Sequence, residues 1–316
     1  MRPIEEQLIK YLTDCHAMEV QALAQMRKAP ELAGDRDVAA AFEVHCTETE
    51  RHEELIRERL AAYDASPSQL EDLLGRVSGK GFVLFAQLNP DTPGKLATHA
   101  YSYEHMELAA YDLLERVAQR AGDEETAAVA RTIRAEEEAM AIRIGESWDR
   151  TVAASLRDRE AGEHITDYLA DAHALEAQSN ALLDRGPKLA AGTSLAAVLE
   201  NHHAETQGHS ELLERRLGEL DSSPSRLKDA ALKLGGINWG GFWAANPDTP
   251  VKLAMFAYAV EHLEIGAYEH LTRTARLAGD GDTAMVADTI LPQERAAAEF
   301  IFGTFDDALN ASLQRG

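Results

Sequence analysis

Apolar residues recur every three or four positions along most of the chain, with charged residues between them, which is the pattern of amphipathic helices. In the first half this pattern stops at residues that break or cap helices: Pro30 and Gly34, Ser66 followed by Pro67, and Gly122. Strong helix formers such as Ala, Leu, Glu and Arg are abundant. The chain is therefore expected to be all-α. The predicted helices of the first half run over about residues 3–28, 35–65, 92–121 and 123–148.

The chain repeats itself at an offset of 157 residues. Residues 89–111 read NPDTPGKLATHAYSYEHMELAAY and residues 246–268 read NPDTPVKLAMFAYAVEHLEIGAY, which agree at 15 of 23 positions. Similarity at a fixed offset indicates a duplicated structural unit. We therefore predict two tandem domains, over residues 1–157 and 158–316, each with the same four helices.

The lengths of the connections predict how the four helices are joined. Short turns link the first helix to the second and the third to the fourth, so each pair is expected to form an antiparallel hairpin. Residues 66–91 separate the two hairpins, and a short extra helix is expected there after Ser66 and Pro67. A segment of this length can return along the whole bundle. The prediction is a four-helix bundle in each half, made of two hairpins joined by one long crossover.

Composition then narrows the class of protein. The chain has 31 Lys and Arg against 54 Asp and Glu, a formal net charge of −23, so nucleic-acid and membrane-surface partners are not expected. Cys15 and Cys46 are too few for a disulfide framework and indicate a reducing compartment. The first residues do not resemble a signal peptide, and the sequence has no apolar run long enough to span a bilayer. We expect a cytoplasmic protein.

Histidines and acids lie on the helix faces that the apolar pattern turns inward. Spacings of three, four and seven positions keep these residues on one face of each helix. Acids beside them drift between the halves; Glu136, for example, becomes Gln293. The inward-facing set comprises His16, Glu19, His45, Glu48, His52, Glu104, Glu107, Tyr111 and Glu137, and it recurs as His173, Glu176, His202, Glu205, His209, Glu261, Glu264, Tyr268 and Glu294.

These groups need compensation inside a bundle. One carboxylate from each helix gives a charge near −4, and burying that charge alone costs many kcal/mol or forces protonation. Two divalent cations would supply the missing charge, and oxygen and imidazole ligands suit iron or manganese. We therefore predict a dinuclear metal centre in each bundle, with Tyr111 as a core residue whose hydroxyl is hydrogen-bonded. His105 and His262 lie about 100° around the helix from these acids and are expected in salt bridges or at the surface.

The runs HCTETERH (His45 to His52) and EHMELAAY (Glu104 to Tyr111), with Glu19 and Glu137, resemble the ferritin-like superfamily, and in particular small bacterial ferritin-like proteins of the YciE/YciF type. The resemblance covers nearly the whole chain, once in each half. It implies two tandem ferritin-like bundles, each with a di-iron site, and a ferroxidase or oxygen-handling activity in stress responses or iron homeostasis.

The same resemblance assigns roles to residues in both halves. The ligands that it implies are Glu19, Glu48, His52, Glu107 and Glu137, and Glu176, Glu205, His209, Glu264 and Glu294. Residues that it implies as ligands or as groups around them are His45, Glu104, His202 and Glu261. Further candidates for either role, from their place on the inward faces, are His16, Tyr111, His173 and Tyr268.

The motif departs from the usual di-iron pattern of Glu-x-x-His on two helices. Three residues separate Glu48 from His52, and Met140 stands where the fourth helix would carry its histidine. Either His45 or His52 could therefore accompany Glu48 at the metal. A site with fewer histidines is expected to bind one ion tightly and the other weakly.

Three functions remain open on the sequence. The first is oxidation of ferrous iron by dioxygen or peroxide, with two irons in each bundle. The second is a manganese or mixed-metal centre that consumes peroxide, because the same ligands suit both metals. The third is a metal-free structural module whose acidic surface recruits a basic partner. Because the two bundles are already fused, we expect a monomer or a simple homodimer.

Overall fold

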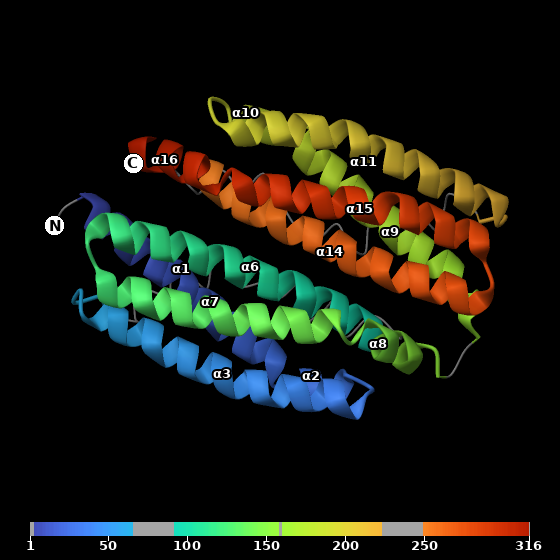
Figure 1. Ribbon diagram of the computed structural model, residues 1–316, viewed down its shortest axis with the longest axis horizontal. Coiled ribbons are helices and arrows are strands. Elements are labelled where there is room, and N and C mark those ends of the chain that lie inside the picture. The colour runs from blue at the N-terminus through green and yellow to red at the C-terminus, as the bar shows by residue number, and fades with distance from the viewer. Residues whose placement is uncertain (1–2, 66–91, 158–159, 223–248, 316) are drawn as a thin grey trace.

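The computed structural model describes residues 3–65, 92–157, 160–222 and 249–315, and all the regular secondary structure in these ranges is α-helical (Figure 1). The prediction of an all-α chain is confirmed for this part of the chain. The first half contains α1 (Pro3–Met26), α2 (Ala29–Leu32), α3 (Arg36–Ala61), α6 (Thr92–Ala121), α7 (Glu124–Gly145) and α8 (Trp148–Ser155). The second half contains α9 (Ala161–Leu183), α10 (Gly186–Leu189), α11 (Ser194–Glu219), α14 (Thr249–Ala278), α15 (Gly281–Gly303) and α16 (Phe305–Arg315).

The helix boundaries follow from local chemistry. The Asp35 side chain accepts hydrogen bonds from the backbone N–H groups of Asp37 and Val38, which fixes the start of α3. Gly122, with φ of +76°, ends α6 in the left-handed conformation that glycine adopts without strain. The helix predicted over 123–148 is shorter than expected, because α7 ends at Gly145 and the chain continues as the separate helix α8.

In the first half, α1 packs against α3 and α6, α6 packs against α7, and α7 packs against α3, so the four helices enclose one interior. Arg59 near the end of α3 pairs with Asp123 before α7, at 3.2 Å. At the other end, Gly34 before α3 lies against Pro93 in the first turn of α6. Helices α3 and α6 therefore run parallel, so the chain between them must connect opposite ends of the bundle.

The second half repeats this arrangement with α9, α11, α14 and α15, and the pair Arg216 and Asp280, at 2.9 Å, takes the place of Arg59 and Asp123. The two hairpins of each half agree with the prediction, and the residues that join them lie outside the described ranges. The short extra helix expected after Ser66 and Pro67 falls outside the described residues. No helix in the described ranges combines the length and the apolar character needed to cross a membrane.

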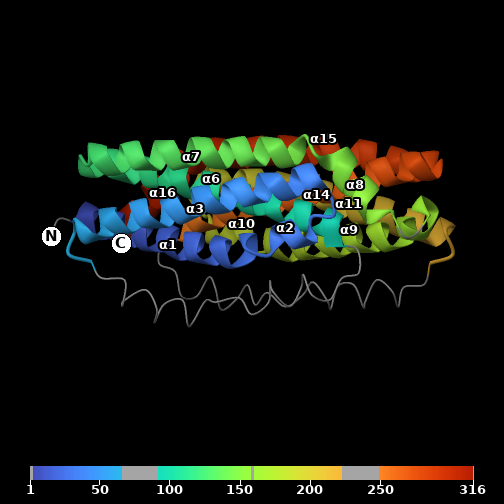
Figure 2. The same cartoon turned by 90° about the horizontal axis from the view of Figure 1, so that it is seen from below.

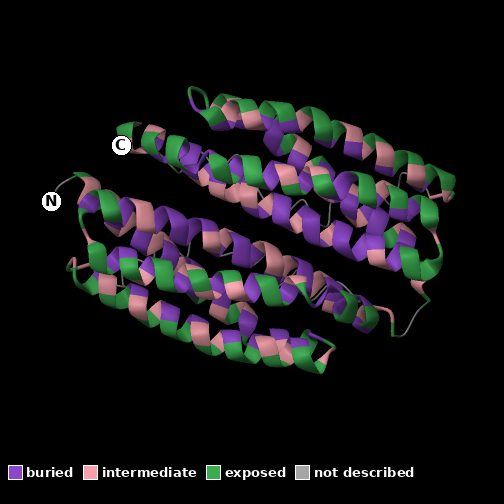
Figure 3. Cartoon of the chain, viewed as in Figure 1, coloured by how far each residue is buried: buried purple, intermediate pink, exposed green. Residues whose placement is uncertain are grey.

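The two bundles lie side by side, and α6 of the first contacts α14 of the second (Figure 1). Seen from below, α7 and α15 lie on one face of the molecule, and α1 and α9 lie on the opposite face (Figure 2). Buried residues follow the sides of the helices that face the bundle interiors and the contact between bundles (Figure 3). We call the contact surface between the two bundles, formed mainly by α6, α8, α14 and α16 with contributions from α1 and α9, the interface.

Several contacts across the interface occur in pairs related by the offset of 157. Lys95 pairs with Asp171 and Lys252 pairs with Asp14, both at 2.8 Å between the ammonium and a carboxylate oxygen. The short helices α8 and α16 also reach across, because Asp149 pairs with Arg273 at 2.7 Å and Asp306 pairs with Arg116 at 2.6 Å. The interface therefore has approximate two-fold symmetry.

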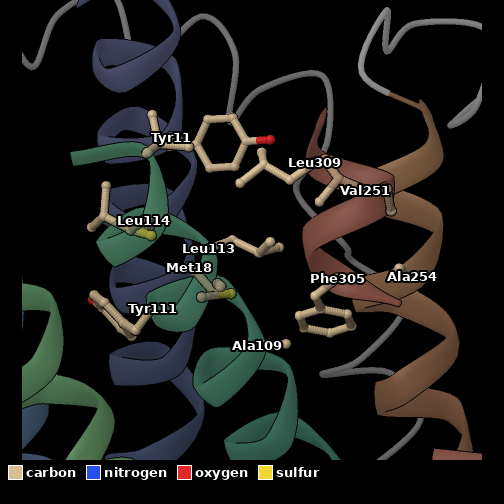
Figure 4. Packing of buried hydrophobic residues seen from close by; sticks show 14 of the residues in the cluster. Tyr11, Met18, Ala109, Tyr111, Leu113, Leu114, Val251, Ala254, Phe305 and Leu309 are labelled. Carbon is tan, nitrogen blue, oxygen red and sulfur yellow. The ribbon is translucent and has the colours of Figure 1, made fainter. Parts of the chain in front are cut away.

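The helix α16 fills one side of this interface with apolar side chains. Phe305 and Leu309 project from α16 between Ala109 of α6 and Val251 of α14 (Figure 4). Met18 of α1 joins the same cluster, and all five residues are buried. The two bundles thus share one hydrophobic core on this side.

The prediction for His105 and His262 is wrong. Both are buried, and their rings stack on each other across the interface with centroids 3.5 Å apart and planes 16° apart. Burial lowers the pKa of His105 to about 4, so the stacked rings are neutral. The helix side that was expected at the surface is covered by the other bundle.

Candidate metal centre

Each bundle encloses a set of six acids and histidines, all buried, on its four long helices. Each of the twelve side chains belongs to a residue that is at most 2% exposed. The helical spacing predicted inward orientation for this set, and burial confirms it. We define centre 1 as Glu19, His45, His52, Glu104, Glu107 and Glu137, and centre 2 as Glu176, His202, His209, Glu261, Glu264 and Glu294.

In centre 1 the carboxylate of Glu137 stands between two histidines. One oxygen lies 2.8 Å from Nδ1 of His52, and the other lies 3.3 Å from Nε2 of His45. The side chain of Glu19 reaches the His52 side, and Glu104 approaches His45 Nε2 at 3.1 Å. The centre therefore offers two neighbouring ligand groups that share Glu137.

The two groups have donor atoms close enough to surround one ion each. The His45 position consists of His45, Glu104, Glu107 and Glu137, and the His52 position consists of Glu19, His52 and Glu137; within each position the donor atoms lie within 4.8 Å of one another. Glu137 belongs to both positions, as expected of a carboxylate that bridges two ions. Both His45 and His52 thus face the centre, each in one of the two donor clusters.

Centre 2 repeats this geometry closely. Glu294 lies 2.8 Å from Nδ1 of His209 and 3.3 Å from Nε2 of His202, and Glu261 lies 3.0 Å from the same Nε2 atom. The His202 position is His202, Glu261 and Glu294, and the His209 position is Glu176, His209 and Glu294. Glu264, the equivalent of Glu107, is buried but belongs to neither position.

Burial of so many acids shifts their pKa values. Burial raises the pKa of Glu19 and of Glu104 to about 8, and it raises the pKa of Glu107 well above its usual range. For Glu137, burial acts in the same direction, but the neighbouring His45 and His52 outweigh it and lower the pKa to about 2. Without a metal, the centre therefore stays close to neutral by holding protons.

In centre 2 the shifts have the same directions. Burial raises the pKa of Glu176 and of Glu261 to about 7, and that of Glu264 well above its usual range. The adjacent His202 and His209 lower the pKa of Glu294 to about 2 against the effect of burial. The two centres are thus alike in their electrostatics as well as in their geometry.

The structure does not bring Glu48 and Glu205 into the donor clusters, in contrast to their expected role as ligands. Glu48 contacts Nδ1 of His45 at 3.1 Å, on the side of the ring away from the centre, and Glu205 contacts Nδ1 of His202 at the same distance. Their side chains are 25% and 51% exposed, so solvent reaches both carboxylates. These acids can orient the imidazole rings rather than contact an ion.

His16 and His173 also lie outside the donor clusters. His16 contacts Glu53 at 2.8 Å, and His173 contacts Glu214 at 3.1 Å. The hydroxyls of Tyr111 and Tyr268 donate hydrogen bonds to Glu19 and Glu176, as expected for core tyrosines with a bonded hydroxyl.

Sequence reasoning missed the groups behind His52 and His209. Nε2 of His52 lies 2.6 Å from a carboxylate oxygen of Glu136, and Nε2 of His209 lies 2.9 Å from the amide oxygen of Gln293. Both residues directly precede, in the sequence, the glutamate that the two donor clusters share. Their difference between the halves looked like drift at a surface position, although both halves keep an oxygen acceptor there.

The clusters meet a physical test for metal ligands. Neither carboxylate oxygen of Glu107 accepts a hydrogen bond from any residue that the structure describes, although both oxygens are buried. Facing atoms such as His52 Nδ1 and Glu137 Oε1 lie close without forming a directed hydrogen bond. Buried polar atoms are normally satisfied. Oxygen and imidazole donors that converge without satisfying one another fit a hard or borderline divalent ion.

Comparison with families of known domains gives one match, found twice. The family described as "Domain of unknown function (DUF892)" matches residues 3–157 and again residues 160–314. The two matches together span almost the entire chain and place one domain in each half. No solved structure matches the chain.

Proposed function

This chain belongs to the DUF892 family, and we propose that each of its two DUF892 domains is a ferritin-like four-helix bundle that binds two iron ions and oxidises ferrous iron. The observation that carries the proposal is the pair of donor clusters in each bundle joined by one glutamate, Glu137 or Glu294. Two ions held by a shared carboxylate can act together on one oxidant.

The protein's own groups account for binding. Three carboxylates with raised pKa values, those of Glu19, Glu104 and Glu107, hold protons when no ion is bound. Divalent ions displace those protons, because metal ligands must be deprotonated. The buried charge is then balanced by the ions, and the acids no longer need protonation to remain in the interior.

Tyr111 and Glu48 lie outside the donor clusters, and each contacts one of the proposed ligands. The Tyr111 hydroxyl donates to Glu19, and Glu48 contacts the outer nitrogen of His45. Such contacts fix the ring tautomer and the carboxylate orientation before an ion arrives. Because the equivalent contacts exist for Glu176 and His202, we infer the same roles in the second bundle.

The reaction that this site supports is a two-electron reduction of a small oxidant. Two ferrous ions, as substrate, supply one electron each, and with two protons they convert dioxygen to hydrogen peroxide or hydrogen peroxide to two water molecules. The carboxylates can accommodate the change in iron charge, and the two protons that the reduction consumes come from water.

Metal content and iron oxidation test the proposal. Protein purified from iron-supplemented cells should contain up to four ions, two in each centre. Added ferrous iron should then be oxidised while dioxygen or peroxide is consumed. The variant Glu137→Ala with Glu294→Ala should lose about 100-fold in metal affinity and in oxidation rate, because each shared ligand is removed.

A matched control is Glu43→Ala with Glu200→Ala, which removes two exposed glutamates related by the same offset. It should behave as the parent does. Because the first variant could lose its fold, its helix content is measured by circular dichroism, and the parent is also tested after chelation. If chelated parent protein retains its activity and its thermal stability, the metal proposal is wrong and the structural module is favoured. Manganese content with peroxide disproportionation in the absence of iron would favour the manganese alternative.

We also propose that the chain acts as a monomer or a simple homodimer. The interface between the bundles already buries the faces of α6 and α14, with paired contacts such as Lys95 to Asp171 and Lys252 to Asp14. Each bundle is thereby provided with a partner inside one chain. Light scattering with in-line chromatography checks this state.

A further inference from the structure

Two differences beside the centres separate otherwise matching halves of the chain. The first concerns the outer nitrogen of the histidine in the His52 and His209 positions. His52 faces the carboxylate of Glu136, which also pairs with Arg51, whereas His209 faces the neutral amide of Gln293. An imidazole whose N–H donates to a carboxylate is a stronger metal ligand than one whose N–H donates to an amide.

The orientation of Gln293 supports this assignment. Its amide nitrogen donates to the carbonyl of Thr289 at 3.4 Å, which leaves the amide oxygen to face His209. The residue equivalent to Arg51 is Gly208, so the second half lacks the cation as well as the carboxylate. The whole charged pair behind His52 is therefore absent behind His209.

The second difference concerns Glu107 of centre 1 and its equivalent in centre 2, Glu264. In centre 2 the hydroxyl of Ser179 donates a hydrogen bond to Glu264 at 2.8 Å. The equivalent residue in the first half is Ala22, which has no hydroxyl, and Glu107 accepts no hydrogen bond from the described residues. Glu107 belongs to the His45 position, whereas Glu264 is outside both clusters of centre 2. A serine thus holds in place the carboxylate that a metal would otherwise recruit.

Both differences weaken the same centre. In the His209 position, Gln293 replaces the carboxylate that lies behind His52. In the His202 position, the hydrogen bond from Ser179 holds the carboxylate whose equivalent in centre 1 accepts no hydrogen bond from the described residues. Changes in groups that orient metal ligands commonly alter affinity by about 10–100-fold.

We propose that the two centres are unequal: centre 1 binds divalent ions about 10–100-fold more tightly than centre 2, with Glu136 as a positioning residue for His52 and Ser179 as a competitor for Glu264. This inference rests on the proposed function, because it assumes that both centres bind metal. A tight centre and a weak centre in one chain would fill in order, so the second bundle would load only at higher concentrations of free ferrous iron.

Calorimetric titration with Fe²⁺ in the absence of oxygen tests the proposal in two single-centre backgrounds. Glu294→Ala leaves centre 1, and Glu137→Ala leaves centre 2. The Glu294→Ala background should bind Fe²⁺ about 10–100-fold more tightly than the other. Binding in neither background would contradict the proposed function itself. Equal binding in both would leave that function standing and overturn the inequality.

Reciprocal exchanges identify the residues responsible. In the centre 1 background, Glu136→Gln and Ala22→Ser should each weaken binding. In the centre 2 background, Gln293→Glu and Ser179→Ala should each strengthen it. A gain of affinity is the decisive result, because a residue with a merely structural role would give only losses when exchanged.

Two exposed positions control for charge alone. Glu138→Gln removes one negative charge beside centre 1, and Gln207→Glu adds one on α11 near centre 2. Neither should change affinity as the exchanges do. If the single-centre backgrounds do not fold, the exchanges are made in the unaltered chain, where Glu136→Gln together with Ala22→Ser should merge two classes of site into one. Unchanged affinities after all four exchanges would overturn the assigned roles.

Discussion

The interiors of the two bundles and the interface between them have diverged to different extents. Every residue of centre 1 has an identical counterpart in centre 2 at the offset of 157. Along the interface, several equivalent positions carry different residues. The exchanged pairs are Gly94 and Val251, Thr98 and Met255, His99 and Phe256, Ala109 and Gly266, and Leu113 and His270.

These exchanges make the two sides of the interface chemically different. On one side the ring of His270 lies between the hydroxyls of Thr98 and Thr151, at 3.2 Å and 3.1 Å, beside a cavity of about 60 Å³. On the other side Leu113 and Phe305 belong to a continuous apolar cluster (Figure 4). Approximate two-fold symmetry survives in the paired ion contacts and in the stacked rings of His105 and His262.

The contrast between the centres and the interface shows which kind of contact tolerates substitution less. Apolar contacts tolerate exchange when volume is roughly kept, and a small polar network can replace them when its groups are satisfied. A buried cluster of acids and imidazoles has no such freedom, because removing one partner leaves an uncompensated charge. The acids and imidazoles of the two centres are therefore more tightly constrained than the apolar contacts of the interface.

The largest expected effect is a difference between metal-free and metal-loaded protein in how the free energy of unfolding depends on pH. Between pH 5 and pH 8 the free energy of unfolding of metal-free protein should fall as pH rises. Each proton that the folded chain holds and the unfolded chain has lost contributes about 1.4 kcal/mol per pH unit. Urea denaturation at four pH values measures this slope, and metal-loaded protein should show little of it.

The sign follows from the acids of the centre. The usual pKa of glutamate is about 4.3, whereas Glu19 and Glu104 have values of about 8, so the folded state binds more protons across this range and loses stability as pH rises. His45, raised to a pKa of about 12 by Glu104 and Glu137 against the effect of burial, acts in the same direction above about pH 6.5. Glu137, with a pKa of about 2, contributes stability that is lost only as pH falls below its usual pKa. Identical slopes with and without metal would contradict the assignment.

The next effect concerns the interface. A Cβ atom added at Gly266 would lie 3.0 Å from Cγ2 and 3.3 Å from Cα of Thr98, so α6 and α14 approach closely there. Gly266→Leu should therefore force the helices apart and lower the free energy of unfolding by about 1–3 kcal/mol. Because the two bundles would then be less coupled, calorimetry should show two unfolding transitions rather than one.

Gly208→Leu is the matched control for this substitution. Gly208 lies inside α11, and a Cβ there would meet no described atom within 4 Å. Leucine is the better helix former, so the control should be neutral or stabilising by up to about 1 kcal/mol. Gly266→Leu should also leave the pH slope unchanged. If it alters both the slope and the metal content, the interior and the interface are not independent.

The long helices and their repetition were predictable from sequence because they depend on local spacing. The parallel course of α3 and α6 was predictable too, because a connection of residues 66–91 is long enough to span the bundle. The helices α8 and α16 were not predicted, because their apolar faces are short and are explained only by packing against the other bundle.

The composition of the centre was predictable only in part. Spacing placed Glu48 on the same face as His45 and His52, but it could not decide how far that face is rotated into the interior. The rotation leaves Glu48 at the rim, behind the His45 ring. Likewise, spacing placed His105 away from Glu104 without showing that the second bundle covers that side. Both points concern tertiary orientation, which a single helix does not encode.

The smallest expected effect tests the symmetry that the interface retains. Asp14→Asn and Asp171→Asn each remove one member of the related ion pairs with Lys252 and Lys95. The pairs are partly exposed, so each variant should lose no more than about 1 kcal/mol, and less in concentrated salt. Equal losses in urea denaturation would show that the rim stayed symmetric while the contacts beneath it diverged. A loss confined to Asp171→Asn would show instead that the side with the cavity depends on its ion pair, and that divergence of the interface had reached its charged rim.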